Sequence, residues 1–352
     1  MSLKLFYPIR MAELLLHYHR DIHQWKKSDF SSEHPVISLP RAEFFTHYIF
    51  FQPEDVWLVD WKENESIKSS CCGFPDFLED NTRFFWNAGW WAEKGFNNSM
   101  KTFLAWIKST DGMVLLNDLP ERSLNIVRNL SFFEILPSQT LYQLFFRPYL
   151  PDNLKLNNNF FQWIDEQILT LAFLPKNQGV FQTQPVELKQ PDHAKVDEFL
   201  KSFSGNLTLW STQKILMPEK YPWILTTSNK QNKNYAFTLC KSRYFRKTYI
   251  WKNNNTVSGL MTLMVSGQYL KIPYMFAFED EIYSDMKNFL KQFIISLKIP
   301  VLLTTREDLA QSLQDITFKI RKHKIYRAAS KKLSSKIKNL IWQDGEGDWS
   351  YT

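Results

Sequence analysis

The sequence predicts an α/β (α+β) protein of two tandem domains, each with a mixed, mostly antiparallel central sheet flanked by helices. Residues 256–327 read as strand, strand, helix, strand, helix, strand, and a weaker copy of this order occurs in the first half. The length of 352 residues suits two domains of about 150 residues each. We therefore expect an N-terminal domain at 1–150, a linker with a bridging helix at 151–194, and a C-terminal domain at 195–352.

Apolar periodicity and turn residues place the elements of the first half. Helices are expected at 11–25, 41–51, 99–108 and 121–129. Strands are expected at 56–61, 69–74, 83–86 and 113–116, and a hairpin is expected from 132–136 and 140–146 around Pro137.

The second half has the clearest pattern. Residues 280–297 carry apolar side chains at helical spacing, and the helix stops before Pro300 because proline disfavours helix in the residue before it. Further helices are expected at 160–173, 196–203 and 307–314. Strands are expected at 235–240, 248–251, 259–265, 269–278, 301–304 and from Phe318 to Arg327.

A short sequence match supports a tandem duplication. Residues 100–104 (MKTFL) resemble residues 286–290 (MKNFL), and each lies in a predicted helix that is followed by an apolar strand. The order of elements around both segments is also the same. A repeated structural unit is the interpretation that we favour.

Charge and cysteine usage limit the classes of function. The net charge of +7 is compatible with an anionic partner, including nucleic acid, although a solvated basic face is the favoured interpretation. The strongest basic run extends from Lys319 to Lys338. Three cysteines without metal-like spacing argue against a disulfide framework, and we expect Cys71 and Cys72 to be buried apolar side chains rather than a redox pair.

No metal site, membrane span or signal peptide is expected. His17, His19 and His23 lack a third ligand, and we interpret them as solvated side chains. Residues 344–348 (DGEGD) resemble a calcium loop in composition only, so a capped turn is favoured. Polar and charged residues interrupt the N-terminal apolar residues, and we expect a cytoplasmic protein.

The order of elements in both halves resembles the GNAT N-acetyltransferase fold. Residues 342–352 (WQDGEGDWSYT) add to this resemblance, because they look like the QDGDGD-type ending of uncharacterised GNAT-like proteins of Bacteroidetes-type bacteria. Glu346 replaces one of the aspartates of that ending. The resemblance implies a bacterial tandem GNAT protein.

In the family, backbone N–H groups of a glycine-containing loop before a helix hold the pyrophosphate of acyl-CoA. The second half has no glycine in that loop and places Glu279, Asp280 and Glu281 there, which would repel a pyrophosphate. The first half has glycines and a cation. The cofactor-binding candidates are therefore Gly89, Lys94, Gly95, Asn98 and Ser99.

The chemistry implied by the resemblance is direct attack of an amine on the thioester of acetyl-CoA or another acyl-CoA. It needs a base for the amine and an acid for the thiolate. Glu93 is the candidate base, beside the first loop, and Tyr142 and Tyr326 are candidate acids in late strands. The cleft is expected at residues 87–99 or between the domains.

Three functions stay open at this point. The first is an acyl-CoA-dependent N-acyltransferase whose acceptor is a small-molecule or peptide amine. The second is a catalytically inactive GNAT-like binding or scaffold protein. The third, a FemAB-like aminoacyl-tRNA-dependent transferase, ranks last because the sequence shows no long helical-hairpin insertion; nucleic acid is accordingly not the favoured partner.

Overall fold

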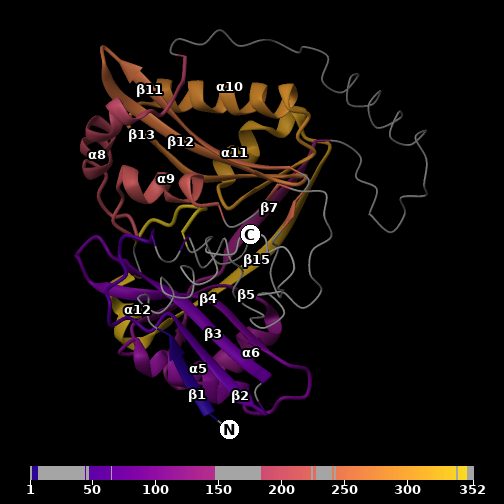
Figure 1. Ribbon diagram of the computed structural model, residues 1–352. Helices are drawn as coiled ribbons and strands as arrows, with labels where there is room; N and C mark the ends of the chain where they lie inside the picture. Colours follow the sequence, from indigo (N-terminus) through magenta and orange to yellow (C-terminus); the bar gives the residue numbers. More distant parts are fainter. Residues whose placement is uncertain are drawn as a thin grey trace, which may run out of the picture. The chain divides into compact units, whose positions relative to one another are not determined.

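The computed structural model describes residues 2–6, 44, 47–64, 66–146, 184–222, 225–226, 240–241, 243–337 and 340–346 (Figure 1). The chain divides into two compact units. Unit 1 contains Met1–Ser138, Leu200–Tyr244 and Tyr326–Thr352, and unit 2 contains Gln139–Phe199 and Phe245–Ile325. The units thus interleave along the sequence, whereas the boundaries predicted from the sequence divide it into contiguous segments.

The sheet of unit 1 is antiparallel except for one neighbouring pair of strands, β4 and β5. In order, its strands are β1 (Ser2–Phe6), β2 (Leu58–Glu63), β3 (Ser66–Phe77), β4 (Arg83–Ala92), β5 (Val114–Leu119) and the last residues of β15 (Lys319–Ser330), which also pair with β6 (Phe133–Ile135). This mixed pattern is the one that the sequence predicts.

Helices cover both faces of this sheet. On one face α5 (Ser99–Ser109) and α6 (Glu121–Arg128) pack on Cys71, Phe85 and Val114. On the other face α9 (Thr212–Lys220) and α12 (Lys331–Ile337) pack on the alternate residues Cys72, Trp86 and Leu115. Successive strand residues point to opposite faces, so both faces of these strands are apolar.

Unit 2 repeats the order of unit 1. Its sheet contains β8 (Val186–Glu187), β11 (Tyr244–Asn253), β12 (Thr256–Ser266), β13 (Tyr269–Ala277), β14 (Val301–Thr304), β7 (Gln139–Phe145) and the first residues of β15, and only β13 and β14 are parallel. Its helices are α8 (His193–Lys201), α10 (Asp280–Ser296) and α11 (Glu307–Ser312), with 3₁₀ turns at Gln190–Asp192 and Gln314–Ile316. In unit 1, a separate two-stranded parallel ladder joins β9 (Leu225–Thr226) to β10 (Cys240–Lys241).

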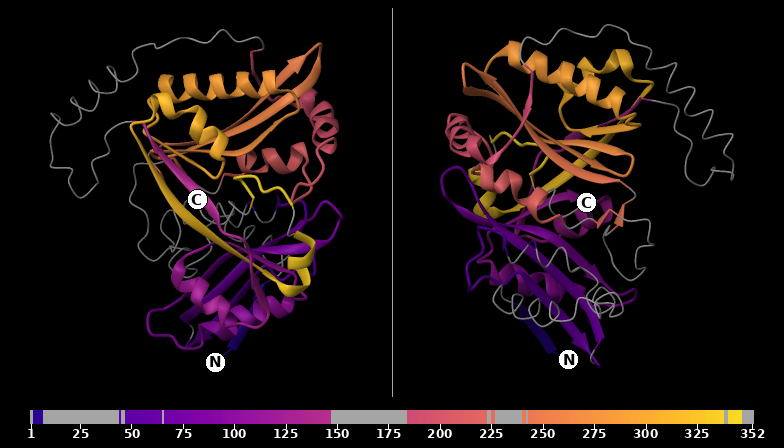
Figure 2. Two further views of the ribbon diagram at one scale, coloured as in Figure 1. Left: turned by 180° about the vertical axis from the view of Figure 1, so that it is seen from behind. Right: turned by 45° about the horizontal axis from the view of Figure 1, so that its top comes forward.

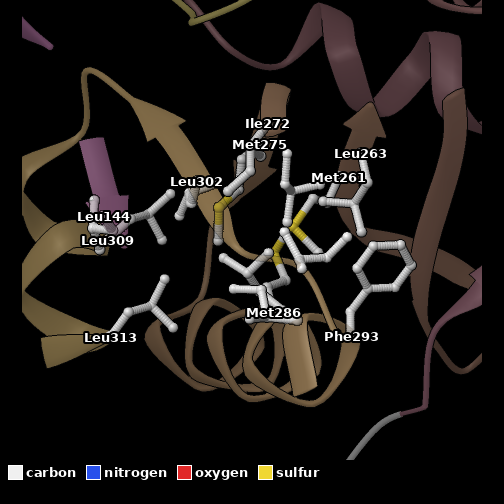
Figure 3. Packing of buried hydrophobic residues seen from close by; sticks show 14 of the residues in the cluster. Leu144, Met261, Leu263, Ile272, Met275, Met286, Phe293, Leu302, Leu309 and Leu313 are labelled. Atoms are coloured by element: carbon white, nitrogen blue, oxygen red, sulfur yellow. The ribbon is translucent and has the colours of Figure 1, made fainter. Parts of the chain in front are cut away.

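The core of unit 2 lies between its sheet and α10. Met286 and Phe293 of α10 point toward Met261 and Met275 of the strands (Figure 3). Leu144 of β7 belongs to the same core. A strand from the first half of the sequence therefore completes the core of unit 2.

The predicted hairpin between the strands at 132–136 and 140–146 is wrong. Strand β6 pairs with Ala328–Ser330 of β15, whereas β7 pairs with β14 and with Lys319–Ile325 (Figure 2). The chain continues past Pro137 instead of turning back, because β15 is long enough to pair with both strands in succession.

Most other sequence predictions agree with the structure, including the fold class and the element order of 256–327. Strands β3 and β4 are longer than predicted, and the sequence analysis missed β1, α9 and α12. The predicted helices at 11–25 and 160–173 lie outside the described residues, as do five of the eleven residues of 41–51 and most of the predicted strand at 235–240.

The short sequence match between the halves does not mark equivalent positions. Met100 is the second residue of α5, whereas Met286 is the seventh residue of α10. Leu104 is 44% exposed while Leu290 is fully buried. The repeat is therefore established by the order and pairing of the strands and not by these five residues.

None of the helices within the described ranges is long and apolar enough to cross a membrane.

A substitution at Gly73 of β3 tests how closely β3 approaches β4 and α5. A Cβ at this position would lie 2.1 Å from Trp106 Cζ2 and 2.4 Å from the backbone oxygen of Trp86. We expect Gly73→Ala to destabilise the protein by about 3 kcal/mol, at the upper end for overpacking, because a backbone atom cannot move aside. Urea unfolding measures this change.

Gly95→Ala is the control, because no atom lies within 4 Å of its added Cβ and only its positive φ of 86° opposes the change. Its expected cost is about 1 kcal/mol. Equal costs for the two variants would contradict the packing described here.

Candidate functional site

The first feature of the candidate site is the separation of two parallel strands in unit 1. Strands β4 and β5 pair only at Phe85–Val114 and Trp86–Leu115, although β4 continues to Ala92 and β5 to Leu119. Immediately beyond these pairs β4 has a bulge, since Gly73 pairs with Asn87 and Cys72 with Gly89, which leaves Ala88 as the extra residue. A bulge bends its strand and increases its twist. The bulge therefore accounts for the separation of β4 from β5.

Beyond the bulge, β4 offers backbone groups on its free side. Glu93 N–H donates to Lys68 O at 2.9 Å, on the side of β3. Because backbone groups alternate along an extended strand, the N–H and C=O of Trp90 face away from β3. No described strand pairs with this part of β4 on that side. The indole of Trp90 is fixed by stacking on the ring of Phe103, with the ring centroids 4.6 Å apart.

The second feature is the start of α5, which follows β4 after a short loop. Asn98 is the N-cap residue without a side-chain cap bond, and the first turn of α5 contains no acidic residue. Lys94 in the loop and Lys101 in the first turn are exposed. The free N–H groups and the positive end of the helix dipole favour an anion at such a terminus.

The structure locates the predicted cofactor-binding residues in two groups. Lys94, Gly95 and Asn98 lie in the loop, and Ser99 is the first residue of α5. Gly89 was expected in the loop, but it is buried inside β4 because the strand extends six residues beyond its predicted end at Trp86.

The three candidate catalytic residues lie in or directly after three different strands, two in unit 1 and one in unit 2. Glu93 is exposed at the end of β4 and forms an ion pair with Lys68 at 2.6 Å. Tyr326 of β15 pairs with Leu119 at the end of β5 in unit 1. Tyr142 belongs to unit 2, where it pairs with Thr304 of β14. Burial and the nearby Glu307 carboxylate raise the pKa of Tyr142.

Unit 2 contains the corresponding strand separation, but its side chains fill it. Strands β13 and β14 pair only from Tyr269–Val301 to Lys271–Leu303, and a register shift follows at once in β13. Arg306 donates from Nη1 to the backbone oxygen of Met275, at 3.2 Å, beyond this shift. Its Nη2 donates to Tyr283 Oη at 2.7 Å, and Tyr283 donates to Asp308. The guanidinium thus occupies the backbone acceptor that the separation exposes.

Two differences therefore distinguish the units. Arg306 is the N-cap residue of α11, and the N-cap residue of α6 in unit 1 is Pro120, which has no side-chain donor. At the other helix, Asp280 and Glu281 lie in the first turn of α10, whereas α5 has no acid there. Both differences favour an anionic, extended ligand in unit 1 and oppose it in unit 2.

A buried polar network connects α9 to strands β3 and β4 of unit 1. Lys214 of α9 donates to Asp76 at 2.8 Å and to Thr208 at 2.9 Å, and each of these side chains is 1% exposed. Trp86 Nε1, from the last paired residue of β4, donates to Asp76 at 3.0 Å. The network thus fixes the strand at the point where the separation begins.

The C-terminal turn joins this network. Thr208 donates to Glu346 Oε1 and Gln343 N–H donates to Oε2, both at 3.1 Å. Asn117 of β5 donates to the backbone oxygen of Glu346 at 2.8 Å. Residues 344–346 thus form a turn, and both carboxylate oxygens of Glu346 accept hydrogen bonds. Burial raises the pKa of Glu346 to about 8, although Lys214 and Arg327 lower it in part.

The two adjacent cysteines are buried thiols that form no disulfide, and their burial agrees with the prediction. They point to opposite faces of β3, since Cys71 packs in one core and Cys72 in the other. Burial, with the neighbouring Cys72, raises the pKa of the Cys71 thiol well above its ordinary value. The parts of the chain with a described structure hold no group of three or more potential metal ligands, and His17, His19 and His23 lie outside them.

Sequence analysis missed the structural roles of five residues. Ala88 and Trp90 were missed because a bulge leaves no mark in apolar periodicity. The contrast between Pro120 and Arg306 was available, since each residue precedes a helix that follows the second parallel strand. Glu346 gave no signal, because its burial depends on contacts with Thr208 and Asn117, which are far away in the sequence.

Comparison with known proteins was informative at the level of the fold. No protein-family model matches the sequence, and no curated protein matches it. A conserved protein of unknown function from Enterococcus faecalis V583, described as a probable N-acyltransferase, is similar with a TM-score of 0.52 and 10% identity, over 96% of this chain and 74% of that one. A GCN5-related N-acetyltransferase from Kribbella flavida is similar with a TM-score of 0.50 and 9% identity, over 93% of this chain and 71% of that one.

These likenesses show that the chain has a fold similar to that of GNAT N-acetyltransferases, as the sequence analysis expected. At identities of about a tenth they show the fold alone.

Glu346 makes stability depend on pH. Its folded-state pKa of about 8 lies above the ordinary value of 4.5, so the folded state keeps a proton that the unfolded state loses between these values. This contribution is complete below pH 4.5 and is lost as the pH rises through 8. We expect the melting temperature to fall from pH 5 to pH 9, and Glu346→Gln to remove part of that fall.

Thermal melts across this range measure the effect, with Glu54→Gln as a control at an exposed position. Parallel pH profiles for the wild type and Glu346→Gln would contradict the assignment.

Proposed function

We propose that this protein is an acyl-CoA-dependent N-acyltransferase whose acyl donor binds in unit 1, while unit 2 is structural. The observation that carries the proposal is the contrast between the two strand separations. In unit 2 Arg306 bonds to the exposed carbonyl of β13, whereas in unit 1 the equivalent N-cap residue is Pro120.

The chemistry of coenzyme A suits this site. Its arm is an extended chain with two amide groups, which would lie along the free side of β4 and exchange hydrogen bonds with the N–H and C=O of Trp90. Its diphosphate would lie at the start of α5, near Lys94 and Lys101. Backbone N–H groups at a helix start and nearby cations are the usual partners of a phosphate.

In the reaction the acceptor nitrogen attacks the thioester carbon, the C–S bond breaks, and CoA leaves as a thiolate. The amine loses one proton to a base and the thiolate gains one from an acid. Tyr326 is our candidate acid, because it pairs with the end of β5. Glu93 stays the candidate base, although its ion pair with Lys68 equally suits a role in fixing the loop. Tyr142 lies in the other unit and is a weaker candidate.

The finer parts of the proposal rest on the sequence. A small-molecule or peptide amine is the proposed acceptor class. The tandem domain boundaries, a cytoplasmic location, a bacterial origin and the relationship to Bacteroidetes-type proteins with a QDGDGD-type ending stay predictions.

Calorimetric titration with acetyl-CoA and longer acyl-CoAs tests the donor site. We expect one bound acyl-CoA per chain. Lys94→Glu with Lys101→Glu should weaken binding by about tenfold or more, because two attractions to the diphosphate become repulsions. Lys108→Glu reverses one charge at the opposite end of α5; it is the control for position and should bind nearly as the wild type does.

Absence of binding by every acyl-CoA would overturn the enzyme proposal and favour the inactive binding or scaffold protein. Binding that is unchanged by Lys94→Glu with Lys101→Glu would leave the activity open but remove the donor from the start of α5.

A further inference from the structure

Among the described residues, the first part of β15 forms a sheet edge in unit 2 and its cationic side chains are exposed. Residues Lys319–Ile325 pair with β7 on one side. The other strands that pair with β15 take only residues from Tyr326 onward. Among the described strands, none pairs with Lys319–Ile325 on its second side. Such an edge presents a row of unpaired N–H and C=O groups.

Cationic side chains lie on both faces of this edge. The exposed basic side chains here follow one another with one interruption, at Ile320. We call this set the basic edge, and it consists of Lys319, Arg321, Lys322, His323 and Lys324. Residues on one face repeat about every 6.8 Å. Within the described part of the chain, none of the five is paired with a carboxylate.

Neighbouring side chains hold the basic edge in place. The guanidinium of Arg321 lies over the Phe145 ring, 5.1 Å from its centroid, and Lys322 Nζ lies 5.2 Å from the centroid of Tyr142. His323 bonds to Gln143 at 3.3 Å. These contacts are made with neutral side chains of β7 and leave the charged groups exposed. Less side-chain freedom is therefore lost when an anionic partner binds.

We propose that the basic edge binds an acidic extended peptide, which adds to the sheet of unit 2 as a further strand beside β15. Main-chain hydrogen bonds to the unpaired groups supply affinity, and acidic side chains on both faces meet the cations. This binding is independent of the proposed acyl transfer.

Two observations select an acidic peptide over other partners. The cations would repel a second copy of the same edge, so pairing with itself is disfavoured. A nucleic acid would form ion pairs with the cations but would leave the row of backbone N–H and C=O groups without hydrogen bonds. An acidic peptide strand would form both the ion pairs and the main-chain hydrogen bonds.

The probe is a labelled, capped peptide of about eight residues, glutamates with two central valines. The full-length protein should bind it in fluorescence anisotropy. Lys322→Glu with Lys324→Glu should weaken binding by at least about tenfold, and Lys322→Gln with Lys324→Gln by less. Lys189→Glu with Lys201→Glu makes the same change of charge at exposed positions outside the basic edge and should leave binding nearly unchanged.

A second peptide of equal charge carries prolines in place of the valines. Proline cannot donate a backbone hydrogen bond, so we expect much weaker binding. Equal binding of the two peptides, or equal loss in the control variant, would overturn strand addition in favour of charge attraction alone. A single-stranded oligonucleotide of equal charge that binds more tightly and shares the dependence on Lys322 and Lys324 would assign the basic edge to nucleic acid and overturn the proposal.

Discussion

The short parallel ladder between β4 and β5 is the constraint on which the candidate site depends. Its two pairs, Phe85–Val114 and Trp86–Leu115, are followed at once by the bulge at Ala88. The added twist bends β4 away from β5, so that none of the described strands pairs with the backbone of Trp90 on that side. Around this point the sheet is fixed from both faces, by Trp106 of α5 against Gly73 and by Asp76 bonded to Trp86 and Lys214.

The same backbone arrangement occurs twice, with opposite consequences for a ligand. In unit 2 a single arginine at the start of α11 bonds to the exposed carbonyl of Met275, and acids surround the start of α10. In unit 1 a proline precedes α6 and lysines lie near α5. Among the described residues, the separation in unit 1 is therefore open, whereas Arg306 closes the one in unit 2. The more regular repeat in the sequence is the closed one.

The sequence predicted the fold well where periodicity is strong. Asp280–Ser296 and Val301–Thr304 appear nearly as expected, because the apolar face of one and the buried run of the other are determined locally. The exchange of β7 into unit 2 was not predictable, since it depends on pairing with β14 and β15 far away in the sequence. For the site, the preference for an anion near Lys94 and against one near Asp280 could be predicted from charge. The bulge, Arg306 bonded to Met275, and the burial of Glu346 required tertiary contacts.

Hydrogen–deuterium exchange with saturating acetyl-CoA tests the central claim most directly, because it locates binding in one unit or the other. The account predicts slower exchange in peptides that cover residues 87–101, where the free backbone of β4 and the N–H groups of α5 would be occupied. Peptides that cover residues 275–285 should exchange at an unchanged rate. Protection of 275–285 without protection of 87–101 would contradict the assignment of the open site to unit 1.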